Sequence, residues 1–184
     1  MVILLWALIV IAALIVISFI VYYNRFVILE NRIDNSLSQI DVQLKKRTDL
    51  VPNLVKTVQG YTKHEKGIMK EVTEARKAML GATDLKGRIK AGNELQSALK
   101  SIFAIAENYP QLKANENFLQ LQQELSAIED KIAYSRQFYN DSVLSYNNGV
   151  ERFPGIIFAK IYGKNEKEFL QIPAEEKAVP KVDF

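Results

Sequence analysis

The chain of 184 residues has a formal net charge of +3, from 24 Lys and Arg against 21 Asp and Glu. These charges are interleaved along the sequence, so no basic face suited to phosphates is expected and nucleic acid is not an expected partner. The sequence contains no cysteine, which excludes disulfides, thiol catalysis and cysteine-ligated metals. A hydrophobic content of 48% suffices for one modest domain and a membrane anchor.

Residues 2–23 form an apolar run whose ionisable side chains are Tyr22 and Tyr23, at its end. As a helix, the run is about 33 Å long, close to the thickness of the hydrocarbon core of a bilayer. Trp6 and the two tyrosines lie near its ends, where aromatic side chains favour the membrane interface. The sequence therefore predicts a transmembrane anchor over residues 1–23, with the lipid bilayer as a partner through residues 2–23.

A cleaved signal peptide is the alternative interpretation of this run. It is disfavoured because no basic residue precedes the run, the run exceeds the usual length of a signal core, and no small-residue cleavage site closes it. Arg25, Arg32 and the cluster at residues 45–47 place positive charge after the run. By the positive-inside rule, we expect a single-pass protein of the cell (inner) membrane, with the N-terminus outside and the remaining chain in the cytoplasm.

Apolar residues continue after the anchor at steps of three and four, which is the period of a helix. They are Phe26, Ile33, Leu37, Ile40, Leu44, Val51, Leu54 and Val58. The phase of this stripe does not change at Pro52, so we predict that Pro52 kinks one helix rather than separating two. The cost is one backbone hydrogen bond and a clash with the carbonyl of Thr48.

The first soluble helix is predicted to span residues 24–59 and to end at Gly60, which suits the left-handed position after a helix. Thr62 and Glu65 then have the spacing of a capping box for a second helix over residues 63–80. The apolar positions of this second helix continue the earlier phase. One very long bent helix is therefore the alternative.

Two further helices complete the predicted domain of residues 24–163. The chain before the third helix is loosened by Gly81, Gly87 and Gly92. The third helix contains Leu95 and ends before Tyr109 and Pro110. Asn115 is the predicted N-cap of a fourth helix that runs to about Val150. The apolar stripe of that helix is Phe118, Leu121, Leu125, Ile128, Ile132, Tyr139 and Tyr146.

Two long and two shorter helices predict an all-α fold, with the transmembrane helix followed by an antiparallel four-helix bundle. In such a bundle the fourth helix descends toward the membrane and brings residues 155–163 to the bilayer surface. This apolar segment either contacts lipid or packs onto the base of the bundle. Residues 164–184 are predicted to be an extended C-terminal tail.

The sequence lacks the residue sets of common catalytic and metal sites. Its single histidine, His64, excludes a di-iron centre, and Ile68 stands where a metalloprotease motif needs a second histidine. No phosphate-binding glycine loop or nucleophile signature is present in the sequence. We therefore assign no catalytic, cofactor-binding or metal-binding residue.

Arg47 is the one charged residue on the apolar stripe of the first soluble helix. If the first and fourth helices pack antiparallel with their ends level, Arg47 faces Glu129. We predict that the two form a buried or half-buried pair that fixes the register of the helices. Tyr139 and Tyr146 are predicted to be core or seam residues whose hydroxyls find polar partners.

Four stretches of the sequence carry a family resemblance. They are NRIDNSLSQIDVQLKKRTDLVPNLVKTVQGYTKHEK at 31–66, EARKAM at 74–79, NYPQLKANENFLQLQQEL at 108–125 and IEDKIAYSRQFYNDSVLSYNNGVERFPG at 128–155. Together and in this order, they resemble the LemA family of bacterial membrane-anchored proteins. The resemblance implies an all-helical bundle with a single-pass anchor and no established catalytic activity. A related branch, the MamQ proteins, is linked to building magnetosome membranes, which by analogy favours a membrane-organising role.

These observations favour a non-enzymatic, membrane-anchored helical scaffold or interaction protein, with membrane or stress-related proteins as partners. One alternative is an enzyme whose pocket is invisible in the sequence. Another is a sensor in which the Pro52 kink or the polar layer shifts when a ligand or lipid binds. A second apolar face on the first helix, with Val27, Leu50 and Val55, serves either the core or a homo-oligomer.

Overall fold

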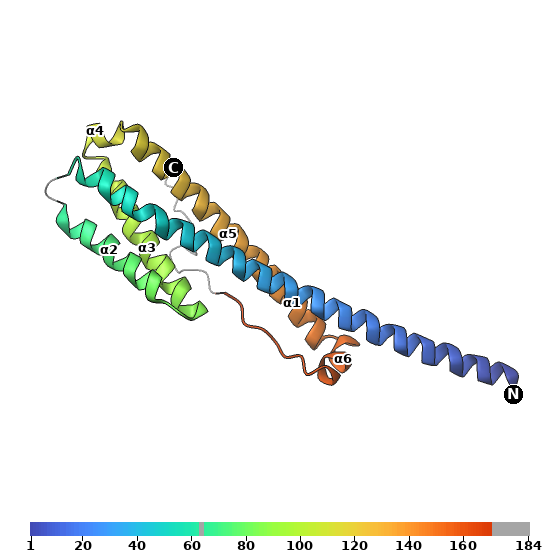
Figure 1. Ribbon diagram of the computed structural model, residues 1–184. Coiled ribbons are helices and arrows are strands. Elements are labelled where there is room, and N and C mark those ends of the chain that lie inside the picture. Colours follow the sequence, from blue (N-terminus) through green and yellow to red (C-terminus); the bar gives the residue numbers. More distant parts are fainter. Residues whose placement is uncertain (63–64, 171–184) are drawn as a thin grey trace, which may run out of the picture. The chain divides into compact units, whose positions relative to one another are not determined.

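The computed structural model of the protein describes residues 1–62 and 65–170. These residues form six helices and no strand, which confirms the all-α class. The helices are α1 (Val2–Gln59), α2 (Lys66–Gly81), α3 (Leu85–Ala106), α4 (Pro110–Lys113), α5 (Glu116–Glu151) and α6 (Gly155–Ile161) (Figure 1). Contacts divide the described chain into a first unit of residues 1–39 and 134–170 and a second unit of residues 40–133.

Helix α1 continues without interruption from the predicted anchor through Pro52 to Gln59. Its predicted apolar stripe is buried, apart from the half-buried Leu37. Pro52 therefore removes one hydrogen bond inside a single helix and does not separate two helices, as the unchanged phase predicted. The most apolar stretch of α1 is entirely exposed, and it is long and apolar enough to cross a membrane.

The end of α1 lies where it was predicted, but its geometry differs from the prediction. Gly60 is not left-handed; among the described glycines, Gly163 has a positive φ of 64°. The amide of Gly60 instead donates to the carbonyl of Thr57 at 3.3 Å. This tight i→i+3 turn satisfies a carbonyl at the end of the helix, so no left-handed residue is needed there.

The predicted capping box at the start of α2 is wrong. The Thr62 hydroxyl donates back to the carbonyl of Val58 (3.0 Å), and Glu65 is itself the N-cap of α2, with no side-chain cap bond. Glu65 instead accepts a hydrogen bond from the hydroxyl of Tyr109 (3.2 Å). Since α1 ends at Gln59, the alternative of one very long helix is also wrong.

Helix α3 begins earlier than predicted because Asp84 caps it: the carboxylate accepts from the amide of Gly87 at 3.1 Å. Gly87 and Gly92 thus lie inside α3 and do not loosen the chain before it. Helix α4 is a single turn with Pro110 in its first turn, and the sequence analysis did not predict it. The cap of α5 is confirmed, since Asn115 Oδ1 accepts a first-turn amide at 3.0 Å.

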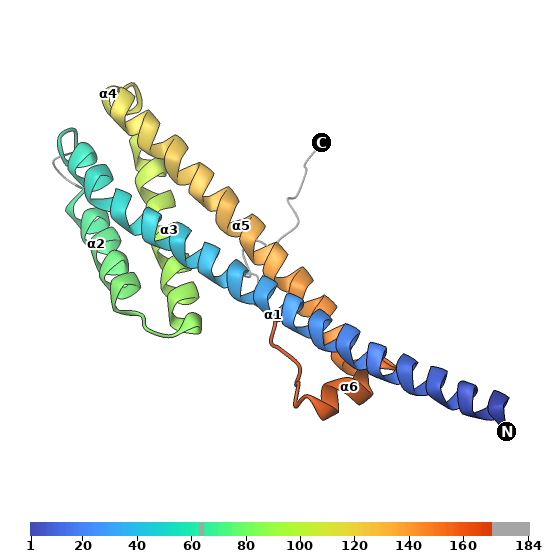
Figure 2. The ribbon, with the colours of Figure 1, turned by 45° about the vertical axis from the view of Figure 1, so that its right-hand side comes forward.

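The second unit has one apolar core, to which all of its helical segments contribute. Figure 2 shows α2 and α3 side by side, and the ends of α1 and α5 that belong to this unit complete the core. The helices of the second unit share this core. Their predicted arrangement as an antiparallel four-helix bundle stays a prediction. The buried residues are Val51, Leu54, Val58, Met69, Val72, Leu95, Ala98, Leu99, Ile102, Ala106, Leu112, Phe118 and Leu125.

In the first unit, α1 and α5 run antiparallel. Phe26 of α1 meets Gly149 of α5, and farther along α1 Glu30 accepts a hydrogen bond from Tyr146, which lies earlier in α5. After α5 the chain turns, and α6 packs on α1 with Phe158 stacked on the ring of Tyr22. Residues 155–163 were expected either to contact lipid or to pack onto the base of a bundle; one face of α6 packs on α1, and the contact with lipid stays a prediction. Residues 171–184 of the predicted tail lie outside the described residues.

Candidate functional site

A buried polar centre lies where α1, α3 and α5 meet in the second unit. The Arg47 side chain is 2% exposed; its Nη2 pairs with Glu129 and its Nη1 donates to the carbonyl of Gly92 at 3.2 Å. The predicted Arg47–Glu129 pair is therefore confirmed, and its role in fixing helix register stays a prediction. Lys45 and Lys46, next in sequence, are exposed.

Gly92 allows α3 to approach α1 at this centre. A Cβ added there would lie 2.8 Å from Cδ2 of the buried Leu44, so a side chain at this position would displace that methyl group. This contact was not predicted, because Gly92 was expected to lie ahead of the third helix. The N-cap at Asp84 is the signal that would have extended the helix over Gly92.

Arg76 of α2 brings a second cation to the neighbouring residue of α1. Its Nε donates to the main-chain carbonyl of Thr48 at 3.0 Å. That carbonyl belongs to the residue four positions before Pro52, which has no amide hydrogen to donate. Arg47 and Arg76 thus hold α1 to three other helices of the second unit through polar contacts.

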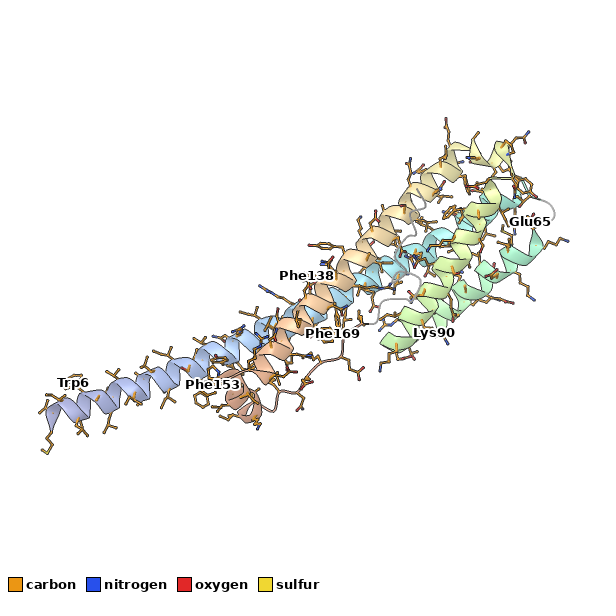
Figure 3. The ribbon with its side chains drawn as sticks, turned by 180° about the vertical axis from the view of Figure 1, so that it is seen from behind. Trp6, Glu65, Lys90, Phe138, Phe153 and Phe169 are labelled. Carbon is orange, nitrogen blue, oxygen red and sulfur yellow. The ribbon has the colours of Figure 1, made fainter. Side chains whose placement is uncertain are left out.

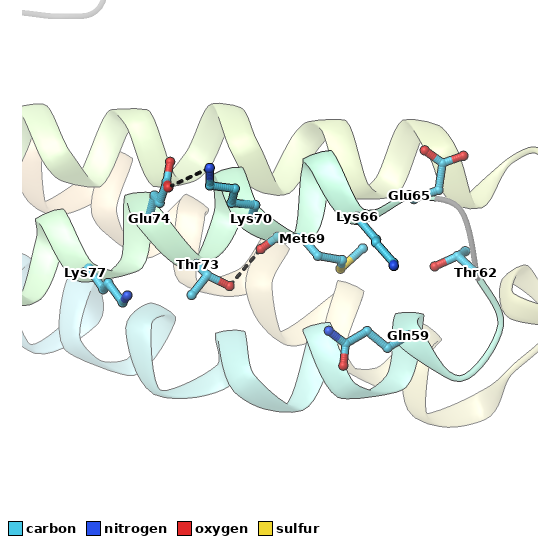
Figure 4. A pocket seen from close by; sticks show the side chains of 9 residues that line it. All are labelled: Gln59, Thr62, Glu65, Lys66, Met69, Lys70, Thr73, Glu74 and Lys77. Carbon is cyan, nitrogen blue, oxygen red and sulfur yellow. Dashed lines mark hydrogen bonds and ion pairs between the residues drawn. The ribbon is translucent and has the colours of Figure 1, made fainter.

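Two pockets in the second unit are lined by charged side chains that already pair with each other. One, of about 240 Å³, adjoins Arg47 and Glu129, which already bond each other. The other, of about 610 Å³, lies beside α2 (Figure 4). There Lys70 pairs with Glu74 (3.7 Å) along the exposed side of α2, and such surface pairs contribute little. His64 of the rejected metalloprotease motif lies outside the described residues.

Glu30 is the centre of a second polar cluster, in the first unit. It accepts hydrogen bonds from the Tyr146 hydroxyl (3.3 Å) and from Lys164 Nζ (2.8 Å). Burial, followed by the charge of Glu30 and the hydrogen bond to it, raises the pKa of Tyr146 to about 12. Burial, followed by the charges of Glu168 and Asp34, also raises the pKa of Tyr139. Both tyrosines are buried with bonded hydroxyls, as predicted.

Side chains of α5 hold the segment after α6 by its backbone. Asn147 bonds both the amide and the carbonyl of Lys167 (2.9 Å each). Asn140, two turns away on the same face, does the same for Leu170 (2.9 and 3.1 Å). The Tyr139 hydroxyl donates to the carbonyl of Glu168 between them (3.0 Å). We call residues 164–170 the strap; its bonds to Asn140, Asn147 and Tyr139 use main-chain groups of the strap, whereas Lys164 at its start bonds Glu30 through its side chain.

Metal-ligating side chains stay apart among the described residues. These residues contain no group of three or more His, Asp or Glu side chains that could hold a metal ion. The shifted groups are tyrosines with raised pKa values, which keeps their hydroxyls protonated near neutral pH. The two polar clusters link helices: Arg47 of α1 bonds α3 and α5, and Glu30 of α1 bonds Tyr146 of α5.

Comparison with known proteins identifies the family. The model of the LemA family matches residues 36–184, which is most of the chain. The chain belongs to the LemA family. This LemA protein is 26% identical to magnetosome protein MamQ 2 of Paramagnetospirillum magneticum, over 90% of its own length and 72% of that relative.

Two other relatives extend this similarity. The protein is 26% identical to magnetosome protein MamQ of Magnetospirillum gryphiswaldense, over 85% of the chain and 68% of the relative. It is 27% identical to protein LemA of Metamycoplasma hominis, over 67% of the chain and 57% of the relative. The resemblance noted from the sequence is thus confirmed. The relatives and the exposed apolar helix together describe a membrane-associated helical protein.

Proposed function

We propose that this LemA protein is a single-pass, non-enzymatic scaffold of the cell (inner) membrane, with its N-terminus outside and its helical units in the cytoplasm. The observation that carries the proposal is α1 itself. One helix contains both the exposed apolar run and the buried stripe of the two units, so an anchor and a folded domain are parts of the same element.

The membrane orientation rests on the basic residues that follow the run, beginning with Arg25. Because the chain has no cysteine, one cysteine at Tyr134, whose side chain is 70% exposed, reports the side of the membrane. A membrane-impermeant maleimide should leave Tyr134→Cys unlabelled in intact cells and label it after lysis. Labelling in intact cells would contradict this orientation and would place the helical units outside the cytoplasm.

The scaffold role requires protein partners, for which the exposed apolar side chains of the first unit offer contact sites. Besides Tyr134, Leu144 is 52% exposed on α5. Two of the relatives are named magnetosome proteins, and we propose that the partners are membrane or stress-related proteins. A second copy of the chain is also among the proposed partners. The second apolar face of α1 is not its contact site at Leu50 and Val55, because these two side chains already pack on the core of the second unit.

Photo-cross-linking in native membranes tests the scaffold role. A photoreactive residue at position 134 should yield a reproducible protein partner by mass spectrometry. The same residue at Val10, inside the apolar run and 54% exposed, is the matched control and should yield mainly lipid. Recovery of only lipid and random neighbours from position 134 would contradict the scaffold.

A further inference from the structure

Helix α6 is held against the last part of the apolar run of α1. Phe158 stacks on Tyr22 with ring centroids 4.5 Å apart and meets Phe19 edge-on at 5.0 Å. Tyr162 donates its hydroxyl to the main-chain carbonyl of Phe19 at 2.8 Å. Since the run as a helix is about as long as a hydrocarbon core is thick, Phe19 and Tyr22 lie at the level where α1 leaves a bilayer. Helix α6 is fixed at that same level.

The other side of α6 exposes apolar side chains. Ile157 and Ile161, one turn apart, are 48% and 56% exposed, and Phe153 in the preceding turn is 81% exposed. Figure 3 shows Phe153 at the α6 end of the first unit. Phe158 and Tyr162 lie on the inner face, so both faces of this short helix are apolar. Soluble proteins rarely expose contiguous apolar side chains without an interaction partner.

The charges around this apolar face suit an anionic membrane surface. Arg152 and Lys160 are exposed next to it in the sequence, against the exposed acidic Glu151, and Arg25 is exposed on α1 three residues after Tyr22. Juxtamembrane basic side chains are attracted to the negative surface of a cytoplasmic leaflet. The composition of the face, apolar with a basic excess at its edge, is that of interfacial helices.

We propose that α6 is a second membrane contact, in which Phe153, Ile157 and Ile161 enter the interfacial region of the bilayer beside the exit of α1. This inference rests on the proposed anchoring of α1. The occupant of the face is lipid rather than a second copy of the chain, because α6 has 7 residues and a stable protein interface buries on the order of 1,600 Å². Lipid needs no such area, since α1 already holds α6 at the bilayer surface.

Site-directed spin labelling can test the contact, because the sequence has no cysteine and an introduced cysteine is the sole site of labelling. Single cysteines at Phe153, Ile157 and Ile161 would carry nitroxides in the full chain, reconstituted in phosphatidylethanolamine and phosphatidylglycerol vesicles. Leu144→Cys, comparably exposed on α5, is the aqueous control, and Val10→Cys is the control within the span. The measurement is the ratio of collision rates with oxygen and with a water-soluble nickel complex.

We expect the three α6 labels to collide several-fold less with nickel than the label at Leu144, at depths shallower than the label at Val10. If they match the label at Leu144 while the label at Val10 is deep, the α6 contact is wrong and the anchor stands. If the label at Val10 is also aqueous, the anchor and the α6 contact both fail. Spin–spin broadening at α6 that disappears on dilution with unlabelled protein would assign the face to a second copy instead, and would overturn the lipid contact.

Discussion

The Arg76 side chain donates its Nε hydrogen to the main-chain carbonyl of Thr48 at 3.0 Å. In an uninterrupted helix this carbonyl would accept from the amide of residue 52, but residue 52 is a proline. A side chain of α2 therefore replaces the hydrogen bond that α1 loses. The proline becomes tolerable inside the helix because another helix satisfies the group that it leaves unbonded.

This relationship predicts that Arg76→Met destabilises the protein by about 1–3 kcal/mol, because a buried carbonyl loses its donor. The cost should fall in a Pro52→Ala background, where residue 52 regains an amide hydrogen. Urea unfolding of the full chain in detergent, read as a double-mutant cycle, measures the coupling. Lys70→Met on the same helix, at a side chain 77% exposed, is the matched control and should change stability by less than about 0.5 kcal/mol. Equal costs of Arg76→Met in the two backgrounds would contradict the substitution of one bond for the other.

The buried Arg47 predicts an asymmetric response to mutation. Glu129→Leu leaves the guanidinium without its carboxylate and should cost about 3 kcal/mol, at the lower end for a broken buried pair because Glu129 is 28% exposed. The double variant Arg47→Met with Glu129→Leu should recover much of this loss, since no charge stays buried. Asp49→Asn breaks the exposed pair with Lys45 and should cost less than about 1 kcal/mol. A double variant less stable than Glu129→Leu alone would show that the pair is required for packing in its own right.

The close packing of Gly155 predicts that any side chain at this position destabilises the first unit. A Cβ at this position would overlap the main-chain carbonyl oxygen of Gly149, which cannot move without distorting α5. We expect Gly155→Ala to lower the midpoint of thermal unfolding and to loosen α6. Gly67→Ala is the control: nothing lies within 4 Å of its Cβ, and alanine in a helix is favoured over glycine by up to about 1 kcal/mol. Equal melting of the two variants would contradict the close contact.

The raised pKa of Tyr146 predicts a loss of stability at high pH. Its pKa is about 12 in the folded protein and about 10 in an unfolded chain. The unfolded chain releases this proton first, so the contribution is complete below pH about 10 and is lost as the pH rises toward 12. The difference in unfolding free energy between wild type and Tyr146→Phe should therefore shrink over this interval. The difference in tyrosinate absorbance between the two proteins measures the pKa directly, and ionisation near pH 10 would contradict the burial of the hydroxyl.

The bonds of the strap predict that removal of one asparagine side chain of α5 loosens residues 164–170 and leaves the rest of the protein unchanged. Asn147→Ala removes both bonds to the backbone of Lys167, so hydrogen exchange in residues 164–170 should accelerate while exchange in α5 changes little. Ser145→Ala is the control, because its exposed hydroxyl bonds only the carbonyl of Asp141 in its own helix among the described contacts. Unchanged exchange of the strap in Asn147→Ala would show that its side chains, rather than these amides, hold it.

The sequence by itself determined the long helices α1 and α5, the apolar run and the pairing of Arg47 with Glu129. Each follows from the helical period: the phase of the stripe carried α1 through Pro52, and the equal lengths of two antiparallel helices placed two distant residues opposite each other. Its local signals were less reliable at Gly60 and Thr62, because several hydrogen-bonding patterns close a helix end equally well.

Only the tertiary structure decided which group replaces the lost bond at Thr48, which side chain Gly92 packs against, and where the strap and α6 attach. These depend on contacts between residues far apart in the chain, and a periodic pattern shows which face of a helix is buried without showing what lies against it. The apolar character of α6 was evident from its residues. Its two faces, one on α1 and one exposed beside the end of the apolar run, became distinguishable only once the fold placed Tyr22 against Phe158.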